Sequence, residues 1–434
     1  LKMILRKIFL TLLLITTVSC EKFRFDNYTL YKILPKSLNE IKLLQNLYDD
    51  VRFDFWRDPV PSTEYVSVVS APQDKGDLEG YLKRNDIAHI QNAIDKERVG
   101  KYTRNNVRSM RWDVYYDLDE INAWLDDLAR AYPSIVNIEI AGTSYEGREI
   151  KGIRISHGEG RRIVFVESGI HAREWITPAT VCYLINELLT STDEETVAAA
   201  HDFDWYIFPV TNPDGFVWTH TDFRLWRKNR RPVGSEFGID LNRNWNSNWL
   251  VQGSSINPAS INYAGPGPFS EPETRHLAAY MRALSDRIDL YLSMHSSGQL
   301  LLIPFGNTTE PLANYHDVNI GRRAMGALSV RYGTEYTTGN VAEAIYYATG
   351  ITVDWVKEHL HVPLVYCYEL RDRGTFGHLL PPEQILPTSE ETMDSIIDLI
   401  HQAKRFGYMS SGNNLRVSIL MTLALTVMYF VRLL

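Results

Sequence analysis

Short, mostly apolar runs recur through the larger part of this chain, and segments of helical periodicity separate them. The runs lie at residues 163–166, 204–210, 288–294, 300–305 and 363–370. Apolar runs of this length are typical of strands that are buried on both faces. Because helices alternate with them, the pattern predicts an α/β domain with a mainly parallel or mixed central sheet that is flanked by helices. In such sheets the functional site lies at the carboxyl ends of the strands.

Helix signals bound this domain. Asp117 and Glu120 form a predicted capping box that starts a helix ending before Pro133. The apolar stripe of that helix consists of Ile121, Trp124, Leu125 and Leu128. A second helix is expected from Thr177 and Pro178, and a final helix is expected to open at Ser389.

A smaller α+β unit is predicted ahead of the domain, over residues 21–104. Its expected strands are residues 28–34, 51–56, 65–69 and 86–94, and residues 37–47 form a helix. A basic stretch then follows, with Lys96, Arg98, Lys101, Arg104, Arg108 and Arg111. This stretch predicts a solvated linker that a trypsin-like protease can cut, most readily after Arg104, Arg108 or Arg111.

Both ends carry targeting signals. Basic residues followed by a short apolar run predict a secretory signal over residues 1–20, with cleavage after Cys20. The chain is therefore expected outside the cell, where Asn27 and Asn307 are potential glycosylation sites. The apolar tail at 413–434 has three interpretations: a cleaved lipid-anchor signal, a short retained membrane span, or a packed helix.

Charge and cysteine content exclude some classes of function. The 434 residues carry a net charge of −8, which disfavours a nucleic-acid partner, since that needs a concentrated basic face. Three cysteines cannot build a disulfide framework. With Cys20 removed, Cys182 and Cys367 are either one pair or, as we favour, two buried free thiols.

A metal site is the strongest chemical signal. His171 and Glu174 are three residues apart just after the strand that ends at residue 166, and His295 ends another apolar strand. Two histidines and one glutamate leave a fourth zinc position open for water, which is the arrangement of catalytic sites. His201 and Asp204 have the same spacing and are an alternative ligand pair.

Several ordered motifs resemble the pancreatic-type (A/B group) zinc metallocarboxypeptidases. They are residues 171–175 (HAREW), 211–215 (TNPDG), 224–228 (RLWRK), 240–245 (DLNRNW), 345–346 (IY) and 369–372 (ELRD). The resemblance implies an activation domain over 21–104 and a catalytic domain over 105–408 with about eight strands. It also implies one zinc ion, peptide and protein substrates, synthesis as a zymogen, and release of C-terminal amino acids.

The resemblance also implies roles for single residues. Glu369 is the expected general base, and it is a good candidate on chemical grounds because it ends an apolar strand. Arg227 would stabilise the oxyanion, whereas Asn242 and Arg243 would bind the free carboxylate of the substrate. Tyr346 would close over the substrate and Arg173 would contact it. Asp240 would orient a zinc-bound histidine.

The resemblance also implies that Val353 lies at the floor of the pocket that receives the C-terminal side chain. With Leu302, Val341, Ala348 and Ile351 it predicts an A-type preference for aliphatic and aromatic residues. Ser297, Gly298 and His378 depart from the family pattern and leave the preference for upstream residues open. The alternative function is a catalytically silent relative that acts as a binding or decoy protein. Loss of Glu369 or Arg227 would mark such a relative, and both are present.

Overall fold

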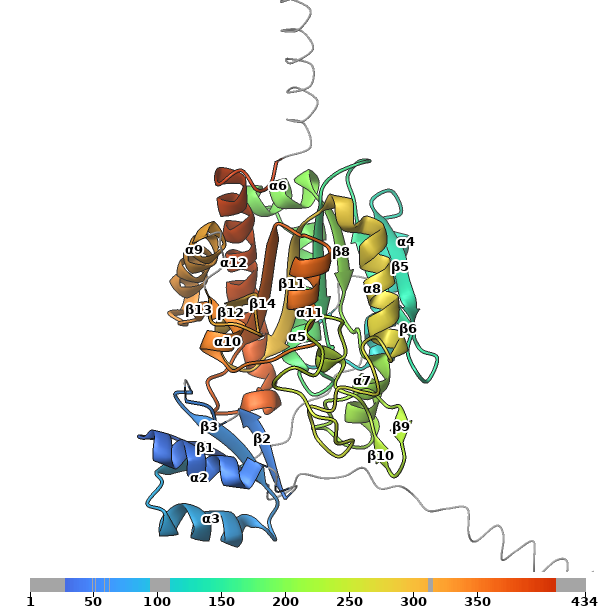
Figure 1. The fold of residues 1–434 in the computed structure, drawn as a ribbon. Helices are drawn as coiled ribbons and strands as arrows, with labels where there is room; N and C mark the ends of the chain where they lie inside the picture. The colour runs from blue at the N-terminus through green and yellow to red at the C-terminus, as the bar shows by residue number, and fades with distance from the viewer. Residues whose placement is uncertain are drawn as a thin grey trace, which may run out of the picture.

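The computed structural model describes residues 28–93, apart from residues 49, 51, 58 and 62, together with residues 110–310 and 315–410. A large body and a smaller unit at one end of it make up the described chain (Figure 1). The predicted signal peptide at 1–20, the cleavage sites Arg104 and Arg108, and the tail at 413–434 lie outside the described residues.

The body is built on a mixed sheet of eight strands in the order β13-β12-β14-β11-β7-β8-β6-β5. The four central strands β14, β11, β7 and β8 are parallel, and antiparallel pairs adjoin them on both sides. The strands are β5 (Val136–Thr143), β6 (Glu149–Ile155), β7 (Ile163–Ser168), β8 (Asp204–Phe208), β11 (Ile288–Ser296), β12 (Leu300–Ile303), β13 (Thr337–Asn340) and β14 (Leu364–Leu370). The predicted mixed α/β sheet is confirmed.

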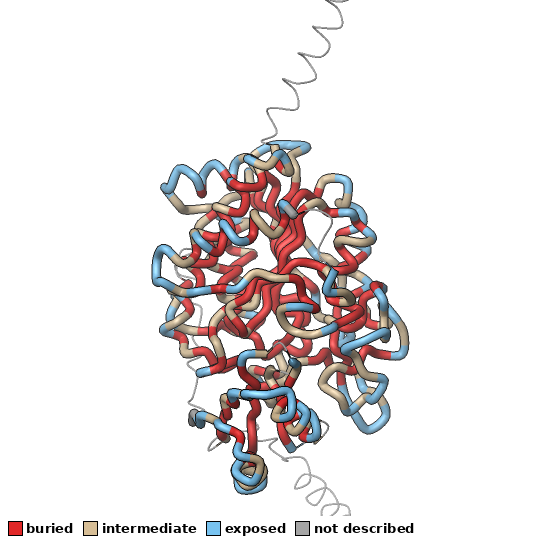
Figure 2. The backbone as a smooth tube through the Cα atoms, turned by 60° about the vertical axis from the view of Figure 1, so that its left-hand side comes forward, coloured by how far each residue is buried: buried red, intermediate tan, exposed pale blue. Residues whose placement is uncertain are grey.

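Side-chain alternation on the central strands creates two hydrophobic cores, one on each face of the sheet. On β7, Val164 and Val166 join one core, whereas Ile163 and Phe165 join the other. The first core is covered by α4 (Leu118–Ala131), α5 (Ile176–Thr190), α9 (Tyr315–Tyr332) and α12 (Ile385–Arg405), and the second by α8 (Pro272–Leu284) and α11 (Thr352–His359). Figure 2 shows the buried strands running through the middle of the body. Burial on both faces explains why these strands lack alternation in the sequence.

The helix boundaries were predicted unequally well. The capping box of Asp117 and Glu120 is present, and Ile121, Trp124, Leu125 and Leu128 are all buried. The final helix, however, begins at Ile385 and not at Ser389. Pro387 lies in its first turn, where the absent backbone N–H has no helical partner to lose, so the proline does not delay the helix.

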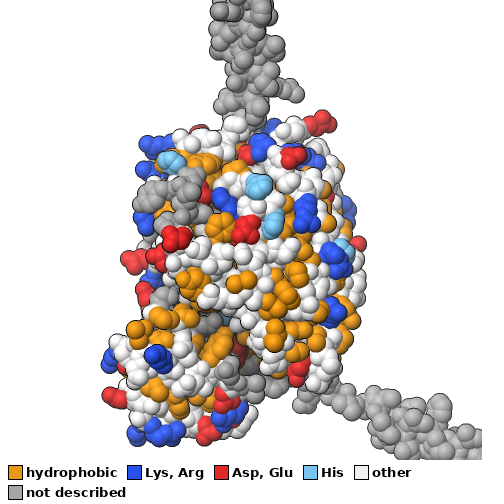
Figure 3. All heavy atoms as spheres, viewed as in Figure 1, with side chains coloured by type: hydrophobic (Ala, Val, Ile, Leu, Met, Phe, Trp, Pro, Cys, Tyr) orange, Lys and Arg blue, Asp and Glu red, His pale blue; other side chains and the backbone are white. Residues whose placement is uncertain are grey.

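The smaller unit has the order β2-β3-β1-β4, with every strand pair antiparallel. Its elements are β1 (Thr29–Ile33), α2 (Leu38–Tyr48), β2 (Phe53–Arg57), β3 (Val66–Ser70), α3 (Lys75–Arg84) and β4 (His89–Ala93). It has a core of its own, centred on residues such as Tyr31, Leu44 and Val68. The space-filling view shows this unit as a lobe against the body (Figure 3). Strand β2 is the part of the lobe that bears on the site.

Two further predictions concern cysteines and membranes. Cys182 and Cys367 are buried free thiols, as favoured from the sequence, and burial raises the pKa of Cys182. Among the described residues, no helix combines the length and the apolar character needed to cross a bilayer.

Candidate active site

The candidate site lies at the carboxyl ends of three neighbouring parallel strands. His171 follows β7, His295 lies near the end of β11, and Glu369 lies near the end of β14, directly paired in register with His295. Because β11 lies between β7 and β14, strand order brings together side chains that are nearly 200 residues apart. The position agrees with the expected location of a site in such sheets.

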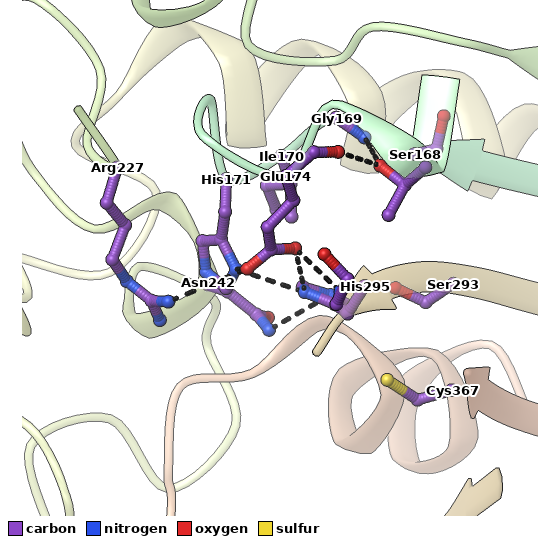
Figure 4. A network of polar contacts seen from close by, with 12 residues as sticks. Ser168, Gly169, Ile170, His171, Glu174, Arg227, Asn242, Ser293, His295 and Cys367 are labelled. Carbon is purple, nitrogen blue, oxygen red and sulfur yellow. Dashed lines mark hydrogen bonds and ion pairs between the residues drawn. The ribbon is translucent and has the colours of Figure 1, made fainter. Parts of the chain in front are cut away.

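Three buried side chains converge on one point. The His171 Nδ1 lies 2.9 Å from a Glu174 carboxylate oxygen and 3.0 Å from the His295 Nδ1. The His295 Nδ1 lies 3.2 Å from the other Glu174 oxygen. Figure 4 shows the two imidazoles and the carboxylate facing one another. Two ring nitrogens this close cannot both carry protons without repulsion, so the geometry favours a shared cation.

The donor set suits zinc. Two imidazole nitrogens and one carboxylate are the ligands of many catalytic zinc sites. Burial lowers the pKa of His171, which keeps that ring neutral and able to coordinate. Burial acts in the same direction on His295, but the Glu174 carboxylate outweighs it and raises the pKa of His295 to about 9. The same carboxylate attraction that holds a proton there would hold a metal ion.

The second candidate pair does not form a metal site. The His201 ring stacks on His157 with 3.7 Å between centroids. The Asp204 carboxylate accepts hydrogen bonds from Arg154 and Arg287 instead. Within the described part of the chain, His171, Glu174 and His295 form the one group of three or more such side chains that could hold an ion.

A buried carboxylate and an arginine support the ligands from behind. Asp240 lies 3.3 Å from the His171 Nε2 and accepts hydrogen bonds of 3.0 and 3.1 Å from the Arg227 guanidinium. Although Asp240 is fully buried, Arg227 and His171 hold its pKa well below the usual range. The Arg227 Nη1 also lies 3.9 Å from Glu174. Asp240 therefore contacts both His171 and Arg227, and its role in orienting His171 stays a prediction.

Asn242, Arg243 and Tyr346 form a polar clamp beside the metal ligands. The Asn242 Nδ2 lies 3.4 Å from the His295 Nε2, and its carbonyl accepts hydrogen bonds from Thr352. The Arg243 guanidinium donates to the Tyr346 hydroxyl at 2.8 Å and to the Gly253 carbonyl at 2.9 Å. The structure thus brings together residues that the sequence places more than 100 positions apart.

An apolar pocket opens from the same cleft. Val353, from α11, lines it and is buried, in a wall with Leu302, Val341, Ala348 and Ile351. The Gly306 N–H donates a bifurcated hydrogen bond to both carboxylate oxygens of Asp354, which is next to Val353, and burial raises the pKa of Asp354 to about 8. Because Asp354 is held there and does not line the pocket, the wall is apolar as predicted.

Glu369 lines the cleft next to the metal ligands. Burial raises the pKa of Glu369 to about 8; His295 opposes this shift, and the Glu174 carboxylate adds to it. Its side chain is partly open to the cleft, in contrast to the buried Glu174. The carboxyl group therefore lies where it can exchange a proton with a molecule in the cleft.

The smaller unit covers the cleft, and the residues through which it does so were not predicted from the sequence. Phe55, Trp56 and Arg57 of β2 line the cleft together with the site residues. Arg173 donates to the Asp54 carboxylate at 3.2 and 3.3 Å. Asp54 and Trp56 were not predicted as site residues, because nothing in a local pattern indicates which strand of one unit reaches another.

Glu167 was missed as well. This carboxyl group is fully buried behind the site and accepts hydrogen bonds from Tyr291, Ser293 and Thr211, and Ser293 lines the cleft. Burial raises the pKa of Glu167. A buried glutamate in an apolar strand was its one signal, since such a residue needs polar partners from elsewhere.

Known proteins share both units. A protein-family model described as zinc carboxypeptidase matches residues 121–395, and one described as carboxypeptidase activation peptide matches residues 31–96. Zinc carboxypeptidase A 1 of Anopheles gambiae is 42% identical over 403 residues, which are 90% of this chain and 93% of that protein. Carboxypeptidase B of Astacus astacus is 42% identical over 66% of this chain and 96% of its own length.

Solved structures agree with the fold. The crystal structure of carboxypeptidase A from Helicoverpa armigera superimposes with a TM-score of 0.77 at 28% identity. The match covers 87% of this chain and 98% of that one. Similar relatives are named both carboxypeptidase A and carboxypeptidase B, so their names do not decide which C-terminal side chain this chain prefers.

Proposed function

This chain belongs to the zinc carboxypeptidase family and is a zinc-dependent exopeptidase with an activation peptide, and we propose how its own residues perform and restrain that activity. His171, Glu174 and His295 hold the zinc ion. The observation that carries the proposal is the convergence of these three ligand groups in one cleft with Glu369, the polar clamp and the apolar pocket.

Glu369 acts as the general base. When bound, zinc acidifies a water molecule, polarises the scissile carbonyl and favours the ionised form of nearby carboxyl groups. The Glu369 carboxylate takes the proton of the attacking water and then donates it to the amine that leaves. Its partial exposure to the cleft and its place beside His295 on the neighbouring strand support this role.

Arg227 and the polar clamp bind the negative charges of the substrate and of the reaction intermediate. Arg227 is held by Asp240 in a fixed orientation, so its guanidinium can stabilise the oxyanion without reorganising during the reaction. Arg243 and Asn242 bind the free carboxylate of the substrate, Arg243 through a two-pronged hydrogen bond. Tyr346 closes over the substrate. This set restricts the enzyme to the last residue of a peptide, because an internal peptide bond offers no carboxylate.

The pocket selects aliphatic and aromatic C-terminal residues. A lysine or arginine side chain would enter a wall of Val353, Ile351 and Leu302 and find no acidic partner there. An apolar side chain gains roughly 1.5–3 kcal/mol from burial in the same space. We therefore propose an A-type preference, with Leu, Ile, Val and Met favoured over Trp because Ile351 narrows the pocket.

The activation unit blocks the cleft until the linker is cut. The match of residues 31–96 to a carboxypeptidase activation peptide supports synthesis as a zymogen. Trp56 and Arg57 of β2 line the cleft, and Asp54 binds Arg173, so a peptide cannot enter while the unit is in place. Met110 is buried, so the peptide bonds around Arg111 are less accessible to a protease. We therefore expect a trypsin-like protease to cut after Arg104 or Arg108.

The route outside the cell is a further part of the proposal. Residues 1–20 direct secretion, and the tail at 413–434 is a lipid-anchor signal. Treatment of intact cells with a phosphatidylinositol phospholipase should then release the enzyme. Enzyme that stays on the cells would indicate a retained span, and enzyme found only in the medium would indicate no attachment.

Trypsin treatment followed by assays on matched peptides tests the function. The uncut chain should be nearly inactive, and cleavage should raise the release of C-terminal Leu and Phe far above that of Lys and Glu. A chelator should abolish the release and added zinc should restore it. Full activity of Glu174→Ala in metal-free buffer, or faster release of Lys than of Leu, would contradict the proposal.

A further inference from the structure

Two basic side chains in the cleft have no partner within the body. Arg173 and His378 are both buried, with 2% and 5% of their surface exposed, and both line the cleft. Neither ring nitrogen of His378, nor the Nε of Arg173, has a hydrogen-bond partner among the described residues. Buried donors without partners are costly, so their persistence indicates a ligand. We call this pair the Arg173–His378 wall.

Another arginine, Arg224, holds the wall together. The Arg224 guanidinium donates to the backbone carbonyl of Arg173 at 2.8 Å and to that of His378 at 2.9 Å. Its Cζ atom lies over the Trp175 ring, 3.6 Å from the ring centroid. The Arg224 side chain thus joins the backbone at Arg173 to the backbone at His378, about 200 positions away. These bonds do not use the side chains of Arg173 and His378.

The activation unit shows what the wall accepts. The Asp54 carboxylate binds the Arg173 Nη1 and also accepts a hydrogen bond from the Trp56 Nε1 at 2.8 Å. The Trp56 ring lies against His378, with 4.9 Å between centroids. Gly377 permits this approach, because a Cβ there would lie 2.4 Å from the Trp56 ring. An extended strand with an acidic side chain therefore occupies the wall before activation.

We propose that, once the activation unit is removed, the Arg173–His378 wall binds the carboxylate of an Asp or Glu side chain upstream of the scissile bond. The inference rests on the proposed function. The polar clamp and the apolar pocket take the C-terminal residue, so the chain that passes Arg173 and His378 is the part that precedes it. The enzyme thus favours peptides with an acidic residue at the penultimate or antepenultimate position.

The chemistry of the donors favours an anion over other side chains. The Arg173 guanidinium keeps its charge and loses its ion-pair partner when Asp54 departs. A neutral imidazole can donate one further N–H to the same carboxylate. A glutamine side chain offers a single carbonyl oxygen without charge, so its hydrogen bonds to the same donors are weaker. A lysine side chain would be repelled by Arg173.

The test compares peptides that differ in one upstream residue. The zinc-loaded full chain, cut with trypsin, is assayed on peptides that end in Leu and carry Glu, Gln or Lys at the penultimate or the antepenultimate position. At one of the two positions kcat/KM should be about ten-fold higher for Glu than for Gln, and lower still for Lys. Equal kcat/KM for Glu and Gln at both positions would overturn the proposal.

A variant assigns the effect to the wall. His378→Phe keeps a ring beside Gly377 but removes both nitrogens, and it should reduce the Glu-to-Gln ratio at least three-fold, on the order of one lost hydrogen bond. His401→Phe, at an exposed position of α12, should leave the ratio unchanged. An unchanged ratio in His378→Phe would exclude His378. The wild-type ratio still decides the proposal if His378→Phe does not fold.

The outcome also separates this inference from the function. Release of Leu from all the peptides, with no preference between Glu and Gln, would refute the wall and leave the exopeptidase intact. Absence of release from every peptide would instead count against the proposed function.

Discussion

The polar clamp and the Arg173–His378 wall lie in one cleft but are completed in different ways. Arg243 finds its partners, Tyr346 and the Gly253 carbonyl, inside the body. Arg173, by contrast, takes its ion-pair partner Asp54 from the activation unit, and His378 takes its ring contact from Trp56. The contacts of the clamp are therefore present before activation. The wall, by contrast, loses its contacts with Asp54 and Trp56 when the activation unit is removed.

In the proposed function, latency comes from covering the cleft and leaves the candidate catalytic centre undisturbed. The metal ligands, Asp240 and Arg227 contact one another and do not depend on the activation unit for any contact that we find among the described residues. Removal of the unit therefore opens a preformed site and does not have to build one.

The largest effect is expected at the base. Glu369→Gln removes proton transfer alone, so turnover of the activated enzyme should fall about 100- to 10,000-fold. Zinc content and substrate binding should remain, since Glu369 is not a ligand. Steady-state kinetics and metal analysis check this, with Glu149→Gln on β6 as an exposed control. Near-normal turnover would mean that another group is the base.

The clamp should come next. Arg243→Gln removes the charge that binds the substrate carboxylate. The loss of roughly 2–5 kcal/mol of transition-state stabilisation should lower kcat/KM about 30-fold or more. Arg331→Gln breaks an exposed ion pair with Asp394 and should change kcat/KM little. Equal losses in the two variants would remove the clamp from the site.

The pocket should show a change of preference. Val353→Asp places a carboxylate at the predicted floor, so the ratio of kcat/KM for Lys over Leu should rise by at least ten-fold, on the order of one desolvated ion pair. Val330→Asp, at a position on α9 that is 84% exposed, is the matched control. If the ratio does not move in Val353→Asp, Val353 is not the floor.

The smallest effect should appear in the uncut precursor. Asp54→Asn weakens one ion pair, whose acidic side chain is 34% exposed. The binding of the activation unit over the cleft should therefore weaken by about 1 kcal/mol. Residual activity of the precursor should therefore rise several-fold and no more. Asp77→Asn, which breaks the exposed pair with Arg52 in the same unit, should have no effect. A rise of similar size in both variants would indicate that the whole unit has loosened.

Local signals account for the parts of the fold that were predicted best. Asp117 and Glu120 cap their helix through contacts three residues apart, and the central strands are apolar because both faces are covered. The strands β5, β6 and β13 were not predicted. β5 and β13 are the edges of the sheet and β6 lies next to β5, and each of the three mixes exposed, half-buried and buried positions, so none forms a continuous apolar run. The last helix was predicted to start at Ser389 but starts at Ile385. The sequence did not reveal this, because a proline such as Pro387 can stand either just before a helix or in its first turn.

The chain by itself determined which side chains take part, and the tertiary structure decided how they meet. His171, Glu174, His295 and Glu369 were predicted from their places after or at the ends of apolar runs together with the family resemblance of the ordered motifs around them. The strand order β14-β11-β7, the sharing of the Asp240 carboxylate by two partners and the cover of Asp54 and Trp56 over the cleft were not. These depend on contacts between segments far apart in the sequence, from 69 positions for His171 and Asp240 to 322 positions for Trp56 and His378. Such contacts are set by packing and leave no periodic trace in the sequence.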